Sequence, residues 1–396
     1  MKTKAPPKIV IVGCGVVGAM IAYELSSQIH AEIHVIDKSP EHSSTGAALG
    51  VLMGVISHKV KGRTWRLREA SVQRYRSLIQ ELGEANQPVP FNTQGIVSLC
   101  FNQNKLPKWE KLREKRLSQG WPLEIWSPTE LKARCPQIEL TAHSLEERTE
   151  KSQTKIEENQ QVQAAIYSPA DGQVHPTKLT QALCTVAAQR GVTFHKGVEV
   201  TSLDIEDARC VSVQTTEKQI AADWVILSAG LGSAALTKLA HPSTEKIEDK
   251  SKSLELMSVL GQAMEVELPD ALGDRTFQPV INGHDIQLVP LENNRYWIGA
   301  TVEFPQENEP LVAEAQGIET LLKEASRFCP DLSHAKIIRT WSGLRPRPVG
   351  QPAPVIQPLA PLQNVTLATG HYRNGVLLAP ATAQQVCEQL RLSFPS

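Results

Sequence analysis

A glycine fingerprint near the N-terminus constrains the fold of this chain more than any other feature. Ile9 to Val12 is a run of β-branched residues, typical of a strand buried on both faces of a parallel sheet. Gly13, Gly15 and Gly18 follow with the spacing G-x-G-x-x-G, and helical periodicity begins directly afterwards. The glycines therefore lie where a strand passes into a helix, a place where free N–H groups and the positive end of the helix dipole bind phosphates.

A carboxylate completes this fingerprint. The next strand, Glu32 to Ile36, ends in Asp37, about 20 residues after Gly18, where an acid can accept hydrogen bonds from a ribose. With strand, helix and acid in place, the segment predicts a site for an ADP moiety; a merely structural glycine turn is the alternative. The fingerprint alone does not separate NAD from FAD.

The overall charge narrows the class of partner. The 396 residues include 41 lysines and arginines against 42 aspartates and glutamates, so the formal net charge is −1. Such a chain has no basic field for nucleic acid or an anionic membrane, and a small-molecule partner is favoured. No apolar run is long enough to span a bilayer, and no secretory signal pattern follows the N-terminal lysines. We therefore expect a cytoplasmic protein without an integral membrane segment.

The cysteines and histidines show no ligand pattern. The seven cysteines are scattered singly without a C-x-x-C pair, and the eleven histidines lack the spacing of metal ligands. This fits neither a disulfide framework nor a zinc site. We expect the cysteines to be small buried apolar residues, and we expect no metal site.

Two later segments repeat the strand-to-helix pattern. Trp224 to Leu227 reads as a strand that ends in the small residues Ser228 to Ser233. Val365 to Ala368 reads as a strand followed by a turn from Gly370 to Gly375 and a helix to about Leu392. We expect both turns at the carboxyl edge of the sheet, where ligands of open α/β folds bind.

A β-rich block between these turns carries no dinucleotide signature. Met257 to Leu268, Ile286 to Pro290 and Arg295 to Val302 alternate as strands, and residues around 88–135 are expected to complete this substrate domain. By contrast, Thr141 to Gln163 is nearly devoid of large apolar residues. It predicts a mobile surface loop, with the solvated face of a short helix as the alternative.

Two C-terminal motifs are the most specific features of the chain: WSGLRP at 341–346 and GHYRNGVLLAPAT at 370–382. Together with the fingerprint they make the chain resemble the D-amino-acid oxidase superfamily of flavoproteins over essentially its whole length, most closely its glycine oxidase (ThiO-like) branch. The resemblance implies non-covalently bound FAD, not NAD. It also implies an α/β fold in which a Rossmann-like FAD-binding domain of the glutathione-reductase-2 type joins an α+β substrate domain built on an antiparallel sheet.

The same resemblance assigns domains and cofactor contacts. The discontinuous FAD-binding domain would comprise 1–87, 164–256 and 346–396, the substrate-binding domain 88–140 and 257–345, and a flexible insertion loop 141–163. The FAD contacts would come from the fingerprint, the flavin-proximal loop and the later turns: Gly13, Gly15, Val16, Val17, Gly18, Asp37, Lys38, Ser44, Thr45, Gly46, Ala47, Ala48, Gly50, Val51, Leu52, Val200, Ala229, Gly230, Gly343, Arg345, His371, Arg373, Asn374, Gly375, Val376 and Leu377.

The resemblance further implies that Arg345 and Arg373 bind the substrate's carboxylate. Guanidinium suits this task because it pairs with a carboxylate through two hydrogen bonds and keeps its charge when partly desolvated. The alternatives are a surface arginine in a proline-rich turn for Arg345 and a purely structural arginine for Arg373. Gln287 stands where many relatives carry a tyrosine, and Val302 is expected to face the pocket as an apolar wall.

The activity implied is that of an FAD-dependent amino acid oxidase. Glycine, sarcosine or D-alanine would pass a hydride to flavin N5, and O2 would reoxidise the flavin to give hydrogen peroxide; the imine from glycine would supply thiazole synthesis for thiamine. Expected partners are a small amino acid or amine, O2, and further copies of the chain in a homo-oligomer. A D-amino-acid dehydrogenase that uses a quinone or carrier, and a non-catalytic flavin-binding module, are the alternatives.

Overall fold

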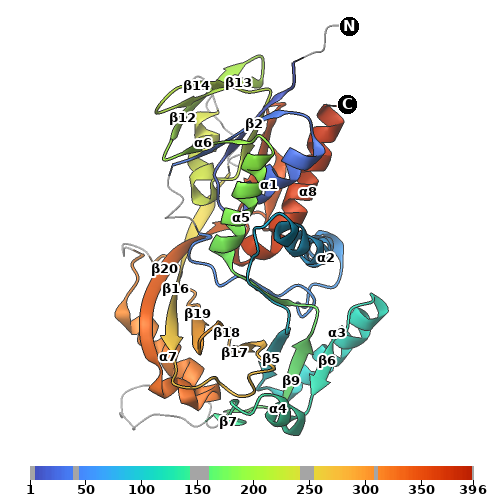
Figure 1. The fold of residues 1–396 in the computed structure, drawn as a ribbon, viewed down its shortest axis with the longest axis vertical. Coiled ribbons are helices and arrows are strands. Elements are labelled where there is room, and N and C mark those ends of the chain that lie inside the picture. The colour runs from blue at the N-terminus through green and yellow to red at the C-terminus, as the bar shows by residue number, and fades with distance from the viewer. Residues whose placement is uncertain (1–4, 39–43, 143–159, 241–253, 307–310, 395–396) are drawn as a thin grey trace.

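The computed structural model describes residues 5–38, 44–142, 160–240, 254–306 and 311–394. The chain builds one sheet in the upper part of Figure 1 and a second, larger sheet in the lower part. Two long strands, β16 (Leu256–Glu267) and β20 (Lys336–Pro348), run along one side and link the two parts.

The upper sheet has six strands in the order β11-β2-β1-β15-β22-β21. Neighbouring strands are parallel, except that β21 runs antiparallel to β22. The strands are β1 (Lys8–Val12), β2 (Glu32–Asp37), β11 (Thr193–Lys196), β15 (Trp224–Leu227), β21 (Val355–Pro358) and β22 (Val365–Thr369). The predicted parallel sheet around the fingerprint strand is confirmed.

Strand β1 is covered on both faces, which explains its unbroken apolar run. Ile9 and Ile11 pack into the core formed with the helices α1 (Val16–Gln28), α5 (Pro176–Gln189) and α8 (Gly375–Ser393). Val10 and Val12 pack instead into the core under a three-stranded antiparallel sheet, which Figure 1 shows at the top of the molecule. That sheet consists of β12 (Val200–Glu206), β13 (Arg209–Thr215) and β14 (Gln219–Ala221).

The lower sheet has eight strands in the order β20-β16-β19-β18-β17-β5-β9-β6. Its pairs are antiparallel except for the parallel pair of β17 and β5. Helix α7 (Ala315–Phe328) packs its apolar residues, Phe328 among them, against one face. The remaining strands are β5 (Ile96–Cys100), β6 (Glu124–Trp126), β9 (Ala164–Ser168), β17 (Val280–Gly283), β18 (Ile286–Pro290) and β19 (Arg295–Gly299).

Shorter elements complete the described chain. They are the helices α2 (Gly62–Glu84), α3 (Leu106–Ser118), α4 (Pro128–Arg134) and α6 (Ser233–Leu239), the small sheet of β3 (Val51–Leu52), β4 (Phe91–Asn92) and β10 (Gly172–Val174), the pair β7 (Thr141–Ala142) and β8 (Gln160–Gln161), and 3-10 turns at Gln103–Lys105, Gly230–Gly232, Pro330–His334 and Tyr372–Asn374. No helix in the described ranges has the length and apolar character needed to cross a bilayer.

The alternative of a proline-rich turn around Arg345 is excluded, because this stretch lies in the thirteen-residue strand β20, which pairs along its length with β16. One strand is shorter than the sequence predicts. Strand β19 ends at Gly299, three residues before Val302.

Most of the expected insertion loop, residues 143–159, lies outside the described residues, and the proposed domain boundaries stay a prediction.

Candidate active site

A cavity of about 1470 Å³ lies between the carboxyl edge of the upper sheet and one face of the lower sheet. It is larger than the roughly 300–1,000 Å³ of a typical small-molecule pocket, so it has room for a dinucleotide and a small second ligand. Of the 26 predicted cofactor contacts, all but Gly18 and Leu52 line this cavity, and so does Gln287.

The fingerprint turn forms one end of the cavity. Gly13 has φ +101°, and a Cβ there would lie 2.6 Å from the Cα of Ala229 in the turn after β15. A Cβ on Gly18 would lie 1.9 Å from the carbonyl oxygen of Gly13, so Gly18 serves the close packing of helix on strand and does not face the cavity. The first turn of α1 therefore reaches the cavity with its backbone, as phosphate binding requires.

Asp37 holds the fingerprint turn in place. Its Oδ2 accepts a hydrogen bond from the backbone N–H of Cys14 at 2.5 Å, and Asp37 also lines the cavity. Its neighbour Lys38 forms an exposed ion pair with Glu199, 2.9 Å away, next to Val200. This is the end of the cavity where the sequence places the adenosine.

The loop from Ser44 to Val51 lies against strand β20. The Ser44 hydroxyl donates to the carbonyl of Leu344 (2.7 Å), and the Trp341 indole N–H donates to the carbonyl of Ala47 (3.1 Å). Thr45 accepts a hydrogen bond from the backbone N–H of Val16 (2.9 Å), which joins this loop to the start of α1. The loop thus connects the dinucleotide end of the cavity to the lower sheet.

Two more strand-to-helix junctions face the cavity beside the fingerprint. Ala229 and Gly230 follow β15, and the Thr369 hydroxyl at the end of β22 donates to the carbonyl of Gly230 (3.0 Å). The turn from His371 to Gly375 then leads into α8, whose N-terminus lies on the cavity wall. His371 is buried, and burial lowers its pKa to about 3, so it stays neutral at ordinary pH.

Two arginines line the cavity close to one another. Nη1 of Arg345 donates to the carbonyl of Leu260 (2.9 Å), and its guanidinium lies so close to Gly261 that a Cβ there would be 2.1 Å from Nη2. Burial lowers the pKa of Arg345, and the positive charge of Arg373 lowers it further. Among the described residues Arg345 forms no ion pair, while Arg373 lies 3.9 Å from the exposed carboxylate of Asp285. The two arginines therefore bring positive charge to the cavity wall.

A row of polar side chains crosses three neighbouring strands on the cavity wall. Gln287 on β18 stands opposite Asn282 on β17, which stands opposite Ser98 on β5. Nε2 of Gln287 donates to Oδ1 of Asn282 (2.8 Å), and Nδ2 of Asn282 donates to Oγ of Ser98 (3.0 Å). This wall of the cavity is therefore polar.

The expected apolar wall residue Val302 does not line the cavity; Ala300 does. The chain leaves strand β19 at Gly299, and Thr301 and Glu303 then pair with β16 through Gln262 and Leu260. This pairing decides which side chains face inward. Leu52 is also absent from the cavity wall, because it packs into the helical core.

Arg68 is a cavity residue that sequence reasoning missed. Its guanidinium donates to the carbonyl of Met53 (2.6 Å) and to Oδ1 of Asn374 (3.0 Å), and burial lowers its pKa. The signal was present in the sequence, because Arg68 lies three residues after Trp65 and four before Val72, within the buried stripe of α2. A charged residue in such a stripe indicates a buried partner.

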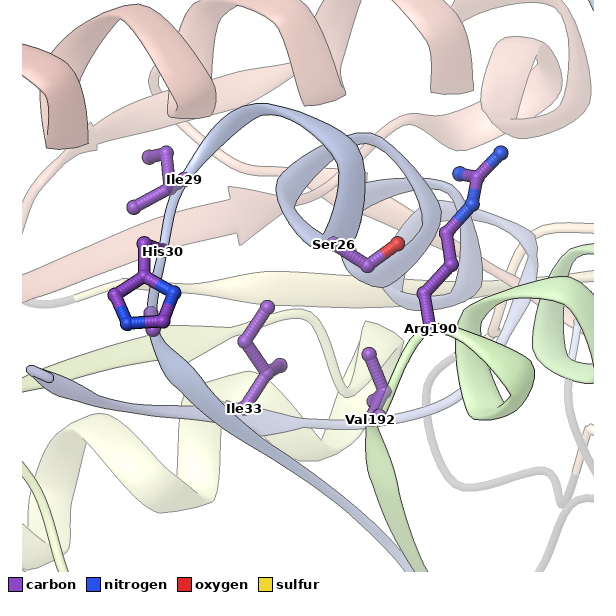
Figure 2. A pocket seen from close by; sticks show the side chains of 8 residues that line it. Ser26, Ile29, His30, Ile33, Arg190 and Val192 are labelled. Atoms are coloured by element: carbon purple, nitrogen blue, oxygen red, sulfur yellow. The ribbon is translucent and has the colours of Figure 1, made fainter.

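A second, much smaller hollow lies away from this cavity and shares no residue with it. Figure 2 shows Ser26, His30 and Arg190 around it, at the end of α1 and the end of α5. Its volume is about 100 Å³, and it opens at the surface. In the described residues no cluster of three or more potential ligand side chains could hold a metal ion.

This geometry is that of a dinucleotide-binding protein whose cavity extends from the glycine fingerprint to a pair of arginines. The family model described as FAD dependent oxidoreductase (DAO) matches residues 8–389, and the chain belongs to this family. Its cofactor is therefore FAD, as the resemblance implied.

Curated relatives agree with this family. The chain is 28% identical over 393 residues to the bifunctional protein ThiO/ThiG of Trichormus variabilis, covering 96% of the chain and 52% of that protein. It is 26% identical over 382 residues to the glycine oxidase of Geobacillus kaustophilus, covering 96% and 92%. The chain thus spans about half the length of its ThiO/ThiG relatives.

Solved structures share the fold. The glycine oxidase from Bacillus cereus superposes with a TM-score of 0.79 at 22% identity, covering 98% of this chain and 96% of the other. The L-proline dehydrogenase from P. horikoshii has the same TM-score at 20% identity, covering 99% and 95%. The mixed α/β fold, which includes antiparallel sheets, is confirmed.

Asp171 fixes the stretch of backbone that leads out of the loop from Ser44 to Val51. Its carboxylate is fully buried and accepts hydrogen bonds from the backbone N–H groups of Gly54 (2.8 Å), Val55 (2.8 Å) and Ile56 (2.7 Å). Burial raises the pKa of Asp171, whereas these three bonds lower it. The carboxylate therefore supplies the hydrogen-bond acceptors that a neighbouring strand would supply to these backbone N–H groups in a sheet.

We expect Asp171→Ala to lower the free energy of unfolding by about 3–5 kcal/mol, because three buried N–H groups lose their acceptor. Asp171→Asn should cost about half as much, since one oxygen remains. The exposed Asp270→Ala is the control and should change stability by less than about 0.5 kcal/mol. Urea unfolding of the holoenzyme followed by fluorescence measures all three; equal stability of Asp171→Ala and Asp270→Ala would contradict this role.

Proposed function

We propose that this enzyme oxidises glycine or another small amino acid or secondary amine with a free carboxylate, and that O2 is its electron acceptor. The pair Arg345 and Arg373 carries this proposal. Two guanidinium groups near each other in a partly desolvated cavity repel each other, and an anion bound between them removes that cost. A carboxylate is the anion that guanidinium matches through two parallel hydrogen bonds.

The described residues fit FAD along the length of the cavity. The backbone of the fingerprint turn and of the Ala229 and Gly230 turn would hold the diphosphate, Asp37 the ribose, and the loop from Ser44 to Val51 the flavin. The N-terminus of α8 would place its positive dipole end beside the cofactor. When bound, FAD supplies a two-electron acceptor. We propose that it is held without a covalent bond, so that denaturation releases intact FAD.

The protein's own residues then act by positioning. Arg345 is held by the Leu260 carbonyl through one nitrogen, which leaves its other N–H groups for the carboxylate, and Arg373 closes the anion site from the turn before α8. No acid–base pair is required, because a neutral amine gives up hydride with the help of its own lone pair. The buried, neutral His371 is consistent with this, since its Nε2 is paired with Oγ1 of Thr382 at 2.9 Å. Orientation is the main contribution of the site.

The polar row of Ser98, Asn282 and Gln287 supports a substrate with a small or hydrogen-bonding remainder. A bulky apolar side chain would cover these groups without giving them partners, which costs binding free energy. Glycine, sarcosine and D-alanine are therefore the proposed substrates. D-Aspartate would bring a second charge beside the exposed Asp285 and is expected to react poorly.

The relatives support this proposal by name only. One relative that the chain covers almost fully is named a glycine oxidase. The link to thiamine thiazole synthesis rests on the ThiO-like resemblance and stays a prediction. The cytoplasmic location and the homo-oligomer also stay predictions.

Arg345→Ala should lower kcat/KM for glycine by roughly two to three and a half decades, the equivalent of about 3–5 kcal/mol for a broken buried ion pair. Arg345→Lys should recover part of this, because a point charge cannot reproduce the two parallel hydrogen bonds. Stopped-flow reduction of the bound flavin measures the effect apart from the later reaction with oxygen.

Arg347→Ala is the matched control for this experiment. Arg347 lies two residues further along β20, is exposed, and stacks over Phe304 with 5.1 Å from its guanidinium carbon to the ring centre. Its loss should leave flavin reduction within about twofold of wild type. Wild-type turnover by Arg345→Ala, or reduction only by amines without a carboxylate, would contradict the carboxylate clamp.

Reoxidation separates the oxidase from the two alternatives. After anaerobic reduction by glycine, exposure to air should restore the yellow flavin within seconds and release one hydrogen peroxide for each flavin, measured by absorbance and a peroxidase assay. Recovery only with a quinone would indicate a dehydrogenase. Failure of every small amine to bleach the flavin would indicate a non-catalytic flavin-binding module.

A further inference from the structure

Two cysteines meet at the fingerprint although they are far apart in the sequence. Cys14 is the residue between the first two fingerprint glycines, and Cys184 lies on α5, 170 residues later. Their Sγ atoms are 3.4 Å apart, and a disulfide requires about 2.0 Å, so each sulfur needs to move by less than about 1 Å. All seven cysteines are free, and these two are partly exposed while the other five are buried.

The surroundings make the two thiols chemically unequal. The hydrogen bond from the Cys14 thiol lowers the pKa of Cys184, and the nearby Lys196 ammonium lowers it further, although burial opposes both. The same contact with Cys184, together with burial, raises the pKa of Cys14. Lys196 is brought there by β11, which pairs with β2 beside Asp37. Cys184 is therefore the thiolate that reacts first, and Cys14 is the thiol that follows.

We propose that Cys14 and Cys184 form a site of reversible oxidation by hydrogen peroxide within the dinucleotide fingerprint. The Cys184 thiolate attacks one peroxide oxygen, the O–O bond breaks, and a sulfenic acid and hydroxide result. The Cys14 sulfur then attacks the Cys184 sulfur and expels the second oxygen as water, after losing its own proton. Two thiols are oxidised by two electrons in all, and one peroxide is reduced to two waters.

This site does not depend on the proposed oxidase activity, because peroxide from any source would react. Its position has a direct structural effect: the disulfide would join the turn between β1 and α1 to the middle of α5. A cross-link that closes so long a loop stabilises the folded chain mainly by restricting the unfolded one. The disulfide would also prevent further oxidation of Cys184 to sulfinic acid, and thiol reductants can convert a disulfide back to two thiols.

Treatment of the purified holoenzyme with a few equivalents of hydrogen peroxide tests the proposal. The number of thiols titrated after denaturation should fall from seven to five. Mass spectrometry of a digest made without reductant should show one peptide pair joined through Cys14 and Cys184 within a single chain. The melting temperature should rise by roughly 3–6 °C, and dithiothreitol should reverse each change.

Cys184→Ser is the matched variant, since it lies off the cavity wall and should keep its FAD. It should show no cross-link and no rise in melting temperature with peroxide, and Cys14→Ser should behave alike. The proposal is overturned if the wild type keeps seven thiols, if its cross-link joins two chains, or if Cys184→Ser still gains the same increase in melting temperature.

Discussion

The close contact between the turn after β1 and the turn after β15 is the constraint on which the cofactor end depends. Gly13 approaches Ala229 so closely that no side chain fits between them, and the Ser228 hydroxyl donates to the carbonyl of Gly13 (2.9 Å). Thr369 ties the third junction to Gly230. Three chain segments, hundreds of residues apart, thereby present their backbone at one sheet edge, where a phosphate-bearing cofactor can meet it.

Buried charges extend this platform to the lower sheet. Besides Asp171, the buried Arg116 donates to the carbonyls of Val55 (2.7 Å) and Ser57 (2.7 Å), with its guanidinium 3.5 Å from the centre of the Trp65 ring. These groups are costly to bury, yet each is satisfied by backbone partners that lack a strand or helix of their own. The backbone of this segment, which lies between the two sheets, therefore has buried hydrogen-bond partners although it belongs to no strand.

The opposite end of the cavity is dominated by positive charge. Arg68, Arg345 and Arg373 all face it, and burial lowers the pKa of the first two. A bound anion would offset the electrostatic cost of holding these charges together at this end.

The sequence by itself determined the dinucleotide end. Its signals are local: a run of apolar residues, glycines at set spacing, and an acid about 20 residues later, all within one strand-helix-strand unit. The resemblance added the two arginines, which the fold brings to one wall.

Only the tertiary structure decided which residues share a wall or a contact. The pairing of β20 with β16 excluded the alternative of a proline-rich turn around Arg345, and the end of β19 placed Ala300 instead of Val302 on the cavity wall. Arg68 with Asn374, and Cys14 with Cys184, are contacts between segments more than 100 residues apart. The spacing of apolar residues along the sequence does not predict such pairs. They depend on strand register and helix packing, which are set only when the whole core is assembled.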